Sequence, residues 1–265
     1  MKFYVVADME GISGIVLQEQ LFLGQPFYQE GRQLLTDEVN AVVESLIQAG
    51  AADIIVRDGH ASGFNFLTHQ LHPGARYVQG VSQPGNRFPG LDSSFDGALL
   101  IGYHSMGGTL QAVRDHSYSS RNFTGMSLNG TPIGEIGLDA LHFGLHGVPV
   151  IFVSGDDKAC QEAQRQLGSA VTYVTKTGAG QHTAILKAPA LARREMGEAI
   201  REAVKRMDQA KPYVIPGPYE LVVHYTATHI ADSRVTDGDS VQRVDGLSVK
   251  YRDADFFKLM ARALH

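Results

Sequence analysis

The sequence contains a single cysteine and no long apolar run, and each absence excludes a class of protein. Because Cys160 is the one thiol, neither an internal disulfide framework nor a zinc site built from several thiolates can form. No stretch of about 18 apolar residues suggests a membrane helix. The first residues reach an acidic side chain at position 8, which argues against a secretory signal peptide. The cytoplasm is therefore the expected location, without a membrane partner.

A strong excess of charge of one sign is also missing. The chain has 23 Lys and Arg residues against 28 Asp and Glu residues, and hence a formal net charge of −5. This mild acidity and the lack of a basic run offer no electrostatic surface for nucleic acid. The length of 265 residues and the 43% hydrophobic content are ordinary for a folded globular protein. We expect one large domain, or a main domain with a smaller partner.

Short apolar runs alternate with amphipathic segments along the first part of the chain. Strands are expected at residues 3–7, 53–57, 97–103 and 148–153, and helices at 31–49, 135–145 and 158–167. Beyond Thr175 the pattern predicts a loop at 176–184, a charged helix at 189–207, two or more longer strands within 221–252 and a final helix at 253–264. This order predicts an α/β, three-layer domain with a largely parallel (mixed) sheet over residues 1–176, and a smaller C-terminal α+β part over residues 177–265.

Side chains that can bind a metal follow three of the predicted strands. Asp8 and Glu10 follow the first strand, His60 the second and His104 the third. In open α/β sheets, ligands bind beyond the carboxyl ends of the strands. Two neighbouring carboxylates repel each other unless a cation lies between them, and a mixed oxygen and nitrogen set suits zinc while tolerating manganese or cobalt. The pattern favours a metal site, although each residue alone is also compatible with a structural role in a turn or loop.

Several segments resemble a known family. The run DMEGISG, residues 8–14, resembles the N-terminal motif of the zinc-dependent D-aminopeptidases of the dipeptide-transport-associated type, the M55 peptidase family. The segments DGHASG, LDSSFDGALLIGYHSMGG, RDHSYSS and LNGTPIGEIGLDA resemble the family's histidine and glutamate segments. VPVIFVSGDDKACQEA and VKYRDADFFKLMARA also look like family segments, so the resemblance covers essentially the whole chain.

The resemblance implies a role for six residues. The implied metal ligands are Asp8, Glu10, His60, His104 and Glu135, and the implied catalytic residue is His116, acting as nucleophile or base. Five protein ligands are enough for two zinc ions per subunit only if one ligand bridges, and Asp8 is the expected bridge. The two ions, with Mn²⁺ or Co²⁺ as substitutes, would ionise a water molecule and polarise the scissile carbonyl, while His116 would assist by moving protons. The alternative for His116 is that it only orders its glycine-rich loop.

The activity expected from this set is that of a metal-dependent aminopeptidase acting on short peptides or aminoacyl amides. The resemblance extends the expected substrates to peptides with an N-terminal D-amino acid, and it implies a ring-like homo-oligomer such as a decamer. Two alternatives remain: a peptide-binding accessory protein that uses the metal for capture, and a different two-metal amidase or phosphohydrolase. A phosphohydrolase would need basic residues that bind phosphate, and the candidates Arg57, Arg114 and Arg121 are too few and too scattered in the sequence to favour it.

Asp156 and Asp157 also follow a predicted strand. Aspartate is a preferred residue at the start of a helix, where its side chain accepts hydrogen bonds from free backbone N–H groups. We therefore expect these two residues to cap the next helix rather than to join the metal site.

Overall fold

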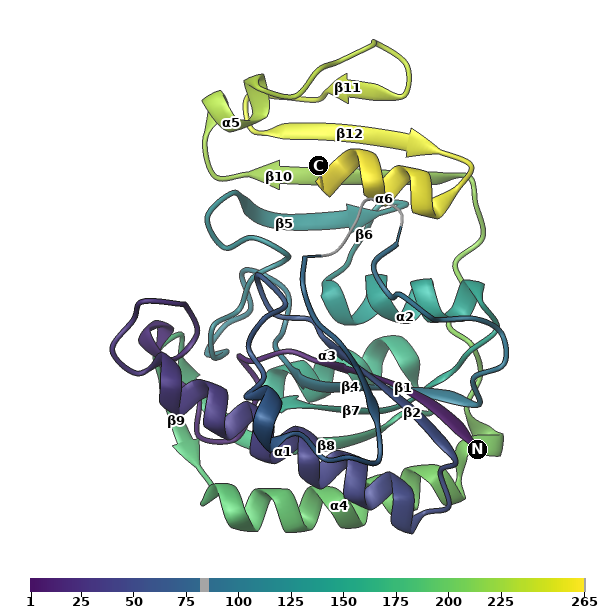
Figure 1. Cartoon of the computed structure of the whole chain (residues 1–265). Helices are drawn as coiled ribbons and strands as arrows, with labels where there is room; N and C mark the ends of the chain where they lie inside the picture. The colour runs from purple at the N-terminus through teal and green to yellow at the C-terminus, as the bar shows by residue number, and fades with distance from the viewer. Residues whose placement is uncertain (82–85, 265) are drawn as a thin grey trace.

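The computed structural model describes residues 1–81 and 86–264, and it contains two sheets (Figure 1). The strands of the first sheet, in their order across it, are β3 (Arg76–Val78), β2 (Asp53–Asp58), β1 (Lys2–Ala7), β4 (Gly97–Tyr103), β7 (Val150–Asp156), β8 (Val171–Gly180) and β9 (Thr183–Leu186). Neighbouring strands are parallel except for β8 and β9, which pair antiparallel. The expected mixed, largely parallel sheet is confirmed.

Helices cover both faces of the seven-stranded sheet (Figure 1). Phe3 and Val5 of β1 belong to the core under α1 (Tyr28–Gln48) and α4 (Pro189–Lys205). Tyr4 and Val6 belong to the core under α2 (Glu135–Leu145) and α3 (Asp157–Leu167). Because successive side chains of a strand point to opposite faces, one continuous apolar run contributes to both cores. The three-layer prediction is confirmed.

The second sheet is antiparallel and lies beside the first (Figure 1). Its strands, in order, are β11 (Val241–Arg243), β12 (Ser248–Asp253), β10 (Tyr219–Tyr225), β5 (Phe123–Leu128) and β6 (Thr131–Pro132). It is accompanied by α5 (Thr228–Asp232) and α6 (Phe256–Leu264), and short 3-10 helices lie at Gln18–Gln20, Thr68–Gln70 and Met207–Gln209. Among the helices that the structure describes, none has the length and apolar character needed to cross a membrane.

Helix α2 lies between the two sheets. Ile136 and Phe143 pack into the core of the seven-stranded sheet, whereas Leu138 and Leu141 pack into the core of the five-stranded sheet. A helix that is apolar on several sides is buried, and α2 is buried along most of its length. Glu135, its first residue, is therefore held by packing on both sides.

One expected loop is a hairpin in the structure. The prediction of a loop at 176–184 was wrong, because β8 continues to Gly180 and pairs with β9. One of the glycines that suggested a loop, Gly178, allows a close approach of two backbone segments. A Cβ atom at Gly178 would lie 2.3 Å from the carbonyl oxygen of Gln111, so only glycine allows this contact.

Each sheet contains segments from both sides of residue 176. Lys176 lies inside β8, and α4 packs against α1 beside the first sheet. Strand β5, from the first half of the chain, pairs with β10. The division into folding units at 1–176 and 177–265 stays a prediction.

Candidate metal centre

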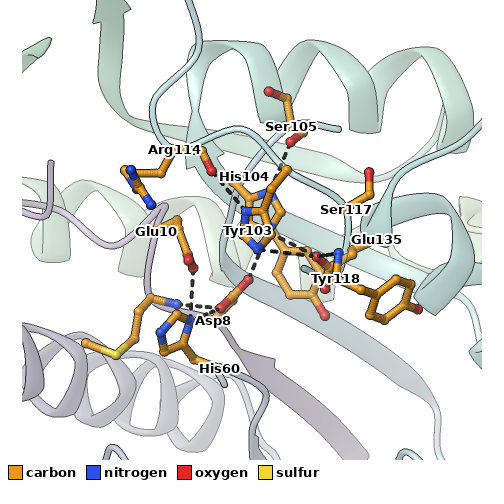
Figure 2. Close-up of polar contacts among 12 residues, drawn as sticks. Asp8, Glu10, His60, Tyr103, His104, Ser105, Arg114, Ser117, Tyr118 and Glu135 are labelled. Carbon is orange, nitrogen blue, oxygen red and sulfur yellow. Dashed lines mark hydrogen bonds and ion pairs between the residues drawn. The ribbon is translucent and has the colours of Figure 1, made fainter. Parts of the chain in front are cut away.

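The carboxyl ends of three adjacent parallel strands bring distant side chains together (Figure 2). Ala7, at the end of β1, is level with Asp58 of β2 on one side and with Ile101 of β4 on the other. Asp8 follows the central strand directly, so it lies between His60, which follows β2, and His104, which follows β4. The order of the strands therefore decides which carboxylate is central.

Asp8 contacts both imidazoles through different oxygens. Its Oδ1 lies 3.0 Å from His60 Nδ1, and its Oδ2 lies 3.4 Å from His104 Nε2. The backbone N–H of Met9 donates to Oδ1 over 2.8 Å and orients the carboxylate. A carboxylate in this position can serve two metal ions at once.

The other two carboxylates complete one group on each side of Asp8. Glu10 Oε2 lies 3.1 Å from His60 Nδ1, and Glu135 Oε1 lies 3.3 Å from His104 Nε2. The backbone N–H of Tyr118 donates to Glu135 Oε1 over 2.7 Å. All five predicted ligands come together, and each is at most 7% exposed.

His116 joins the cluster at its more accessible side. Its ring stacks on that of His104, with centroids 3.9 Å apart, and its Nε2 lies 3.8 Å from Glu135 Oε1. His116 Nδ1 lies 3.0 Å from the carbonyl oxygen of Arg114, which can only accept, so Nδ1 carries a proton and Nε2 faces the cluster. His104, His116 and Glu135 are close enough to hold an ion together, as are Asp8, Glu10 and His104.

The donor set fits zinc. Bonds of about 2.0–2.1 Å in a tetrahedral site place neighbouring ligand atoms about 3.3–3.4 Å apart. The four nitrogen–oxygen contacts among the five predicted ligands run from 3.0 to 3.4 Å. Glu10 Oε2 and His104 Nε2 are buried and make no hydrogen bond of acceptable geometry within the described part of the chain. A cation would satisfy both atoms, so these residues fit a bound metal ion.

Without a metal, the charges of the cluster stabilise one another. Burial by itself lowers the pKa of His60 and His104, but the surrounding carboxylates raise the pKa of both well above the usual value. Burial raises the pKa of Asp8 and Glu135, but the close imidazoles lower it by more, and the pKa of Glu135 falls to about 2. Asp8 and Glu135 are therefore ionised at neutral pH, and protons on the imidazoles balance part of their charge.

A buried lysine holds the backbone that carries Asp8 and Glu10. Lys176 Nζ donates to the carbonyls of Glu10, Ile12 and Ile15 over 2.6, 2.7 and 2.6 Å. The neighbouring Thr175 hydroxyl donates to the carbonyl of Gly11 over 2.6 Å. Burial lowers the pKa of Lys176 to about 8, so the ammonium group is still protonated at neutral pH. Lys176 could not be predicted from the sequence, because no spacing relates it to the motif it supports.

The helix-capping prediction is confirmed for Asp156. Its Oδ1 accepts from the backbone N–H of Ala159 in the first turn of α3, over 2.8 Å. Its Oδ2 accepts from the backbone N–H of Val113 over 2.8 Å. Asp156 therefore also holds the loop that leads to His116.

A cavity of about 940 Å³ opens beside the cluster. Asp8, Glu10, His116 and Glu135 line one side, and Phe257, Met260 and Leu264 of α6 line another. Three arginines, Arg87, Arg114 and Arg121, also line it. This volume lies within the range of about 300–1,000 Å³ that is usual for small-molecule sites.

Buried carboxylates and imidazoles at the carboxyl edge of an α/β sheet, beside a cavity of this size, are typical of a metal-dependent hydrolase. The family model for the D-aminopeptidases of peptidase family M55 matches residues 1–264, and this chain belongs to that family. The resemblance noted in the sequence is confirmed.

Two relatives agree with this assignment. A D-aminopeptidase of Bacillus subtilis (strain 168) is 34% identical over 227 residues, which are 85% of this chain and 81% of that protein. A solved structure, described as the Zn-dependent D-aminopeptidase DppA from Bacillus subtilis, a self-compartmentalizing protease, matches with a TM-score of 0.94 at 29% identity. The match covers 100% of this chain and 96% of that one. Together with the family, these relatives confirm the expected class, a metal-dependent aminopeptidase.

Proposed function

We propose that this protein removes the N-terminal residue from short peptides or aminoacyl amides, including substrates that begin with a D-amino acid, and that it uses two zinc ions per subunit. The observation that carries the proposal is the position of Asp8, whose two oxygens face two separate imidazoles at 3.0 and 3.4 Å. One carboxylate placed in this way supports two metal positions rather than one. The D-aminopeptidase and the zinc-dependent protease among the relatives support the substrate and the metal.

Five residues would hold the zinc ions: Asp8, Glu10, His60, His104 and Glu135. When bound, zinc supplies positive charge that lowers the pKa of water and polarises a carbonyl oxygen. The protein contributes the orientation of these ligands. Met9 and Tyr118 donate backbone hydrogen bonds to two of the carboxylates, and Lys176 holds the loop of the third.

His116 would move the protons of the reaction. The carbonyl of Arg114 holds its Nδ1–H, so Nε2 is directed toward the cluster and the cavity. An imidazole with one free nitrogen can accept a proton from the attacking water and deliver it to the departing amine. Its side chain is 16% exposed, against 9% or less for the five ligands, which suits a group that meets the substrate.

We further propose that the protein assembles into a ring-like homo-oligomer, such as a decamer, in the cytoplasm. The support is the structural relative described as a self-compartmentalizing protease. In such an assembly, access through the ring would restrict substrates to short peptides. Sedimentation measures this directly, and a monomer in native buffer would contradict the ring.

The activity test uses D- and L-aminoacyl dipeptides and the matching amides, before and after removal of metal by a chelator. We expect hydrolysis to stop on chelation and to return with zinc. Undiminished hydrolysis by the metal-stripped protein would refute the mechanism, and saturable binding without turnover would favour the accessory-protein alternative. An Asp8→Asn variant should lose zinc from both positions, since this residue contacts both imidazoles. If the variant lost only one of the two ions, or if the wild type held one, the bridging role would be wrong.

A further inference from the structure

Arg114 is a buried arginine whose side chain has no hydrogen-bond or ion-pair partner among the residues that the structure describes. It is 7% exposed, and its Nε is buried without a hydrogen bond to any residue that the structure describes. Nor does its side chain form an ion pair within 4.0 Å in residues 1–81 and 86–264, in contrast to Arg87, whose Nε lies 2.6 Å from Asp139 Oδ1. The four residues between these two ranges, Ser82 to Gly85, have no acidic side chain. Within the residues that the structure describes, the guanidinium of Arg114 therefore has no carboxylate in direct contact.

The backbone around Arg114 is fixed in place. Its N–H donates to the carbonyl of Gln181 over 3.2 Å, and its own carbonyl accepts from His116. The preceding N–H, that of Val113, donates to Asp156. Arg114 has a φ of +54°, in the left-handed region that residues with a side chain rarely adopt. The hydrogen bonds on both sides hold this backbone conformation, so the point from which the side chain starts is fixed.

The side chain borders the cavity next to the metal cluster. Arg114 lines the same cavity as Asp8, Glu10 and His116, and Figure 2 shows its side chain on the Glu10 side of the cluster. A buried guanidinium without an anion is unfavourable, because burial removes water and no opposite charge replaces it. Its planar fork of N–H donors matches a carboxylate in a bidentate manner. The missing partner is therefore best supplied by a ligand that carries a carboxylate.

We propose that Arg114 binds the C-terminal carboxylate of a short peptide, and thereby makes the enzyme selective for dipeptides with a free C-terminus. This inference rests on the proposed function. In a dipeptide the terminal carboxylate belongs to the residue just beyond the scissile bond, and consecutive Cα atoms are only about 3.8 Å apart. The guanidinium of Arg114 borders the cluster but lies more than 4.0 Å from the described carboxylates. It is therefore placed to bind a carboxylate one residue beyond a bond that is cleaved at the cluster. Longer peptides place their carboxylate farther from the bond and gain less from Arg114.

The experiment compares a dipeptide with its own C-terminal amide, for instance D-alanyl-D-alanine and D-alanyl-D-alaninamide, on zinc-loaded protein. In Arg114→Met we expect kcat/KM to fall by about 10- to 100-fold for the dipeptide, mainly through KM, and to stay within about twofold for the amide. Arg114→Lys keeps the charge and should recover part of the loss. Zinc content and melting temperature, measured on each variant, show that the fold and the metal site are intact.

Arg194→Met is the matched control, because Arg194 is an exposed arginine of α4, outside the lining of the cavity. Arg194→Met should leave kcat/KM unchanged for both the dipeptide and the amide. Equal losses on the dipeptide and on the amide would overturn the inference, because the charge would then act on the reacting carbonyl or on the fold. Unchanged kinetics in Arg114→Met, or a selective loss in Arg121→Met instead, would also overturn it. If the wild type cleaved neither substrate, the proposed function itself would fail.

Discussion

Replacing Lys176 by methionine tests whether the loop that follows β1 depends on one ammonium group. Methionine has a long, unbranched side chain that can fill much of the same space, but it has no donor. The change leaves the carbonyls of Glu10, Ile12 and Ile15 without the hydrogen bonds that they now accept at 2.6, 2.7 and 2.6 Å. Among these three residues, Glu10 is also a proposed metal ligand.

The expected loss of stability follows from these three bonds. A hydrogen bond to a charged group contributes about 1.5–3 kcal/mol, and removing one partner of a buried charged arrangement typically costs about 3–5 kcal/mol in total. The sum of the single bonds exceeds this total, because losing the buried ammonium also removes its own desolvation cost. With a shift of about 2–4 °C per kcal/mol for a chain of this size, the melting temperature should fall by roughly 6–20 °C.

Zinc affinity should fall as well, because a less firmly held loop orients Asp8 and Glu10 less well. Loss of a residue that supports metal ligands typically costs about 10- to 100-fold in affinity. Thermal unfolding of the metal-free protein and competition with a chromophoric chelator measure the two effects separately. Lys187→Met is the control, because Lys187 makes an ion pair with Glu195 at the surface, where such pairs contribute little. A Lys176→Met protein with normal melting temperature and normal zinc affinity would refute the reasoning.

Two other predictions concern the cluster itself. His116→Ala should retain zinc but lose at least about 10²-fold in kcat, as expected when acid–base assistance is removed, and loss of zinc in this variant would make His116 a ligand instead. Zinc binding should strengthen as the pH rises toward the raised pKa values of His60 and His104, because zinc must displace the protons that both imidazoles hold below those values. Calorimetry in buffers of different ionisation enthalpy should record about two protons released per subunit, and an affinity that is independent of pH would show that the imidazoles are already neutral.

The same raised pKa values affect the stability of the metal-free protein. For a histidine whose pKa is higher in the folded state, the gain in stability is complete below the unfolded value and is lost as the pH rises through the folded value. For Asp8 and Glu135, whose pKa is lowered, the gain is present above the unfolded value and is lost as the pH falls through the folded one. Bound zinc replaces these pairings, so the loaded protein should show a weaker dependence on pH through the neutral range.

Features with a local cause could be predicted from the sequence alone. The apolar run 97–103 and the helix 135–145 have the bounds that the pattern predicted, because hydrophobic periodicity and turn residues act within a few positions of one another. The expectation that Asp8, His60 and His104 meet also followed from local information, since parallel strands place their carboxyl ends at one edge. The residue types then indicated a cation between them.

Only the tertiary structure decided which residues support and complete this site. Lys176 reaches Glu10 across 166 positions, and no pattern in the sequence marks such a pair. Gly178 and Gly180 suggested a loop, whereas Gly178 lies inside a strand and allows it to approach the backbone of Gln111, in the segment that leads to Arg114 and His116. That Arg114 finds no partner within residues 1–81 and 86–264 is likewise a property of the packed molecule, because burial and the directions of the neighbouring side chains determine it. Local sequence patterns therefore predicted the helices, the strands and the metal-binding residue types. Long-range packing determined which residues support the site and placed the Arg114 guanidinium where it can bind a ligand.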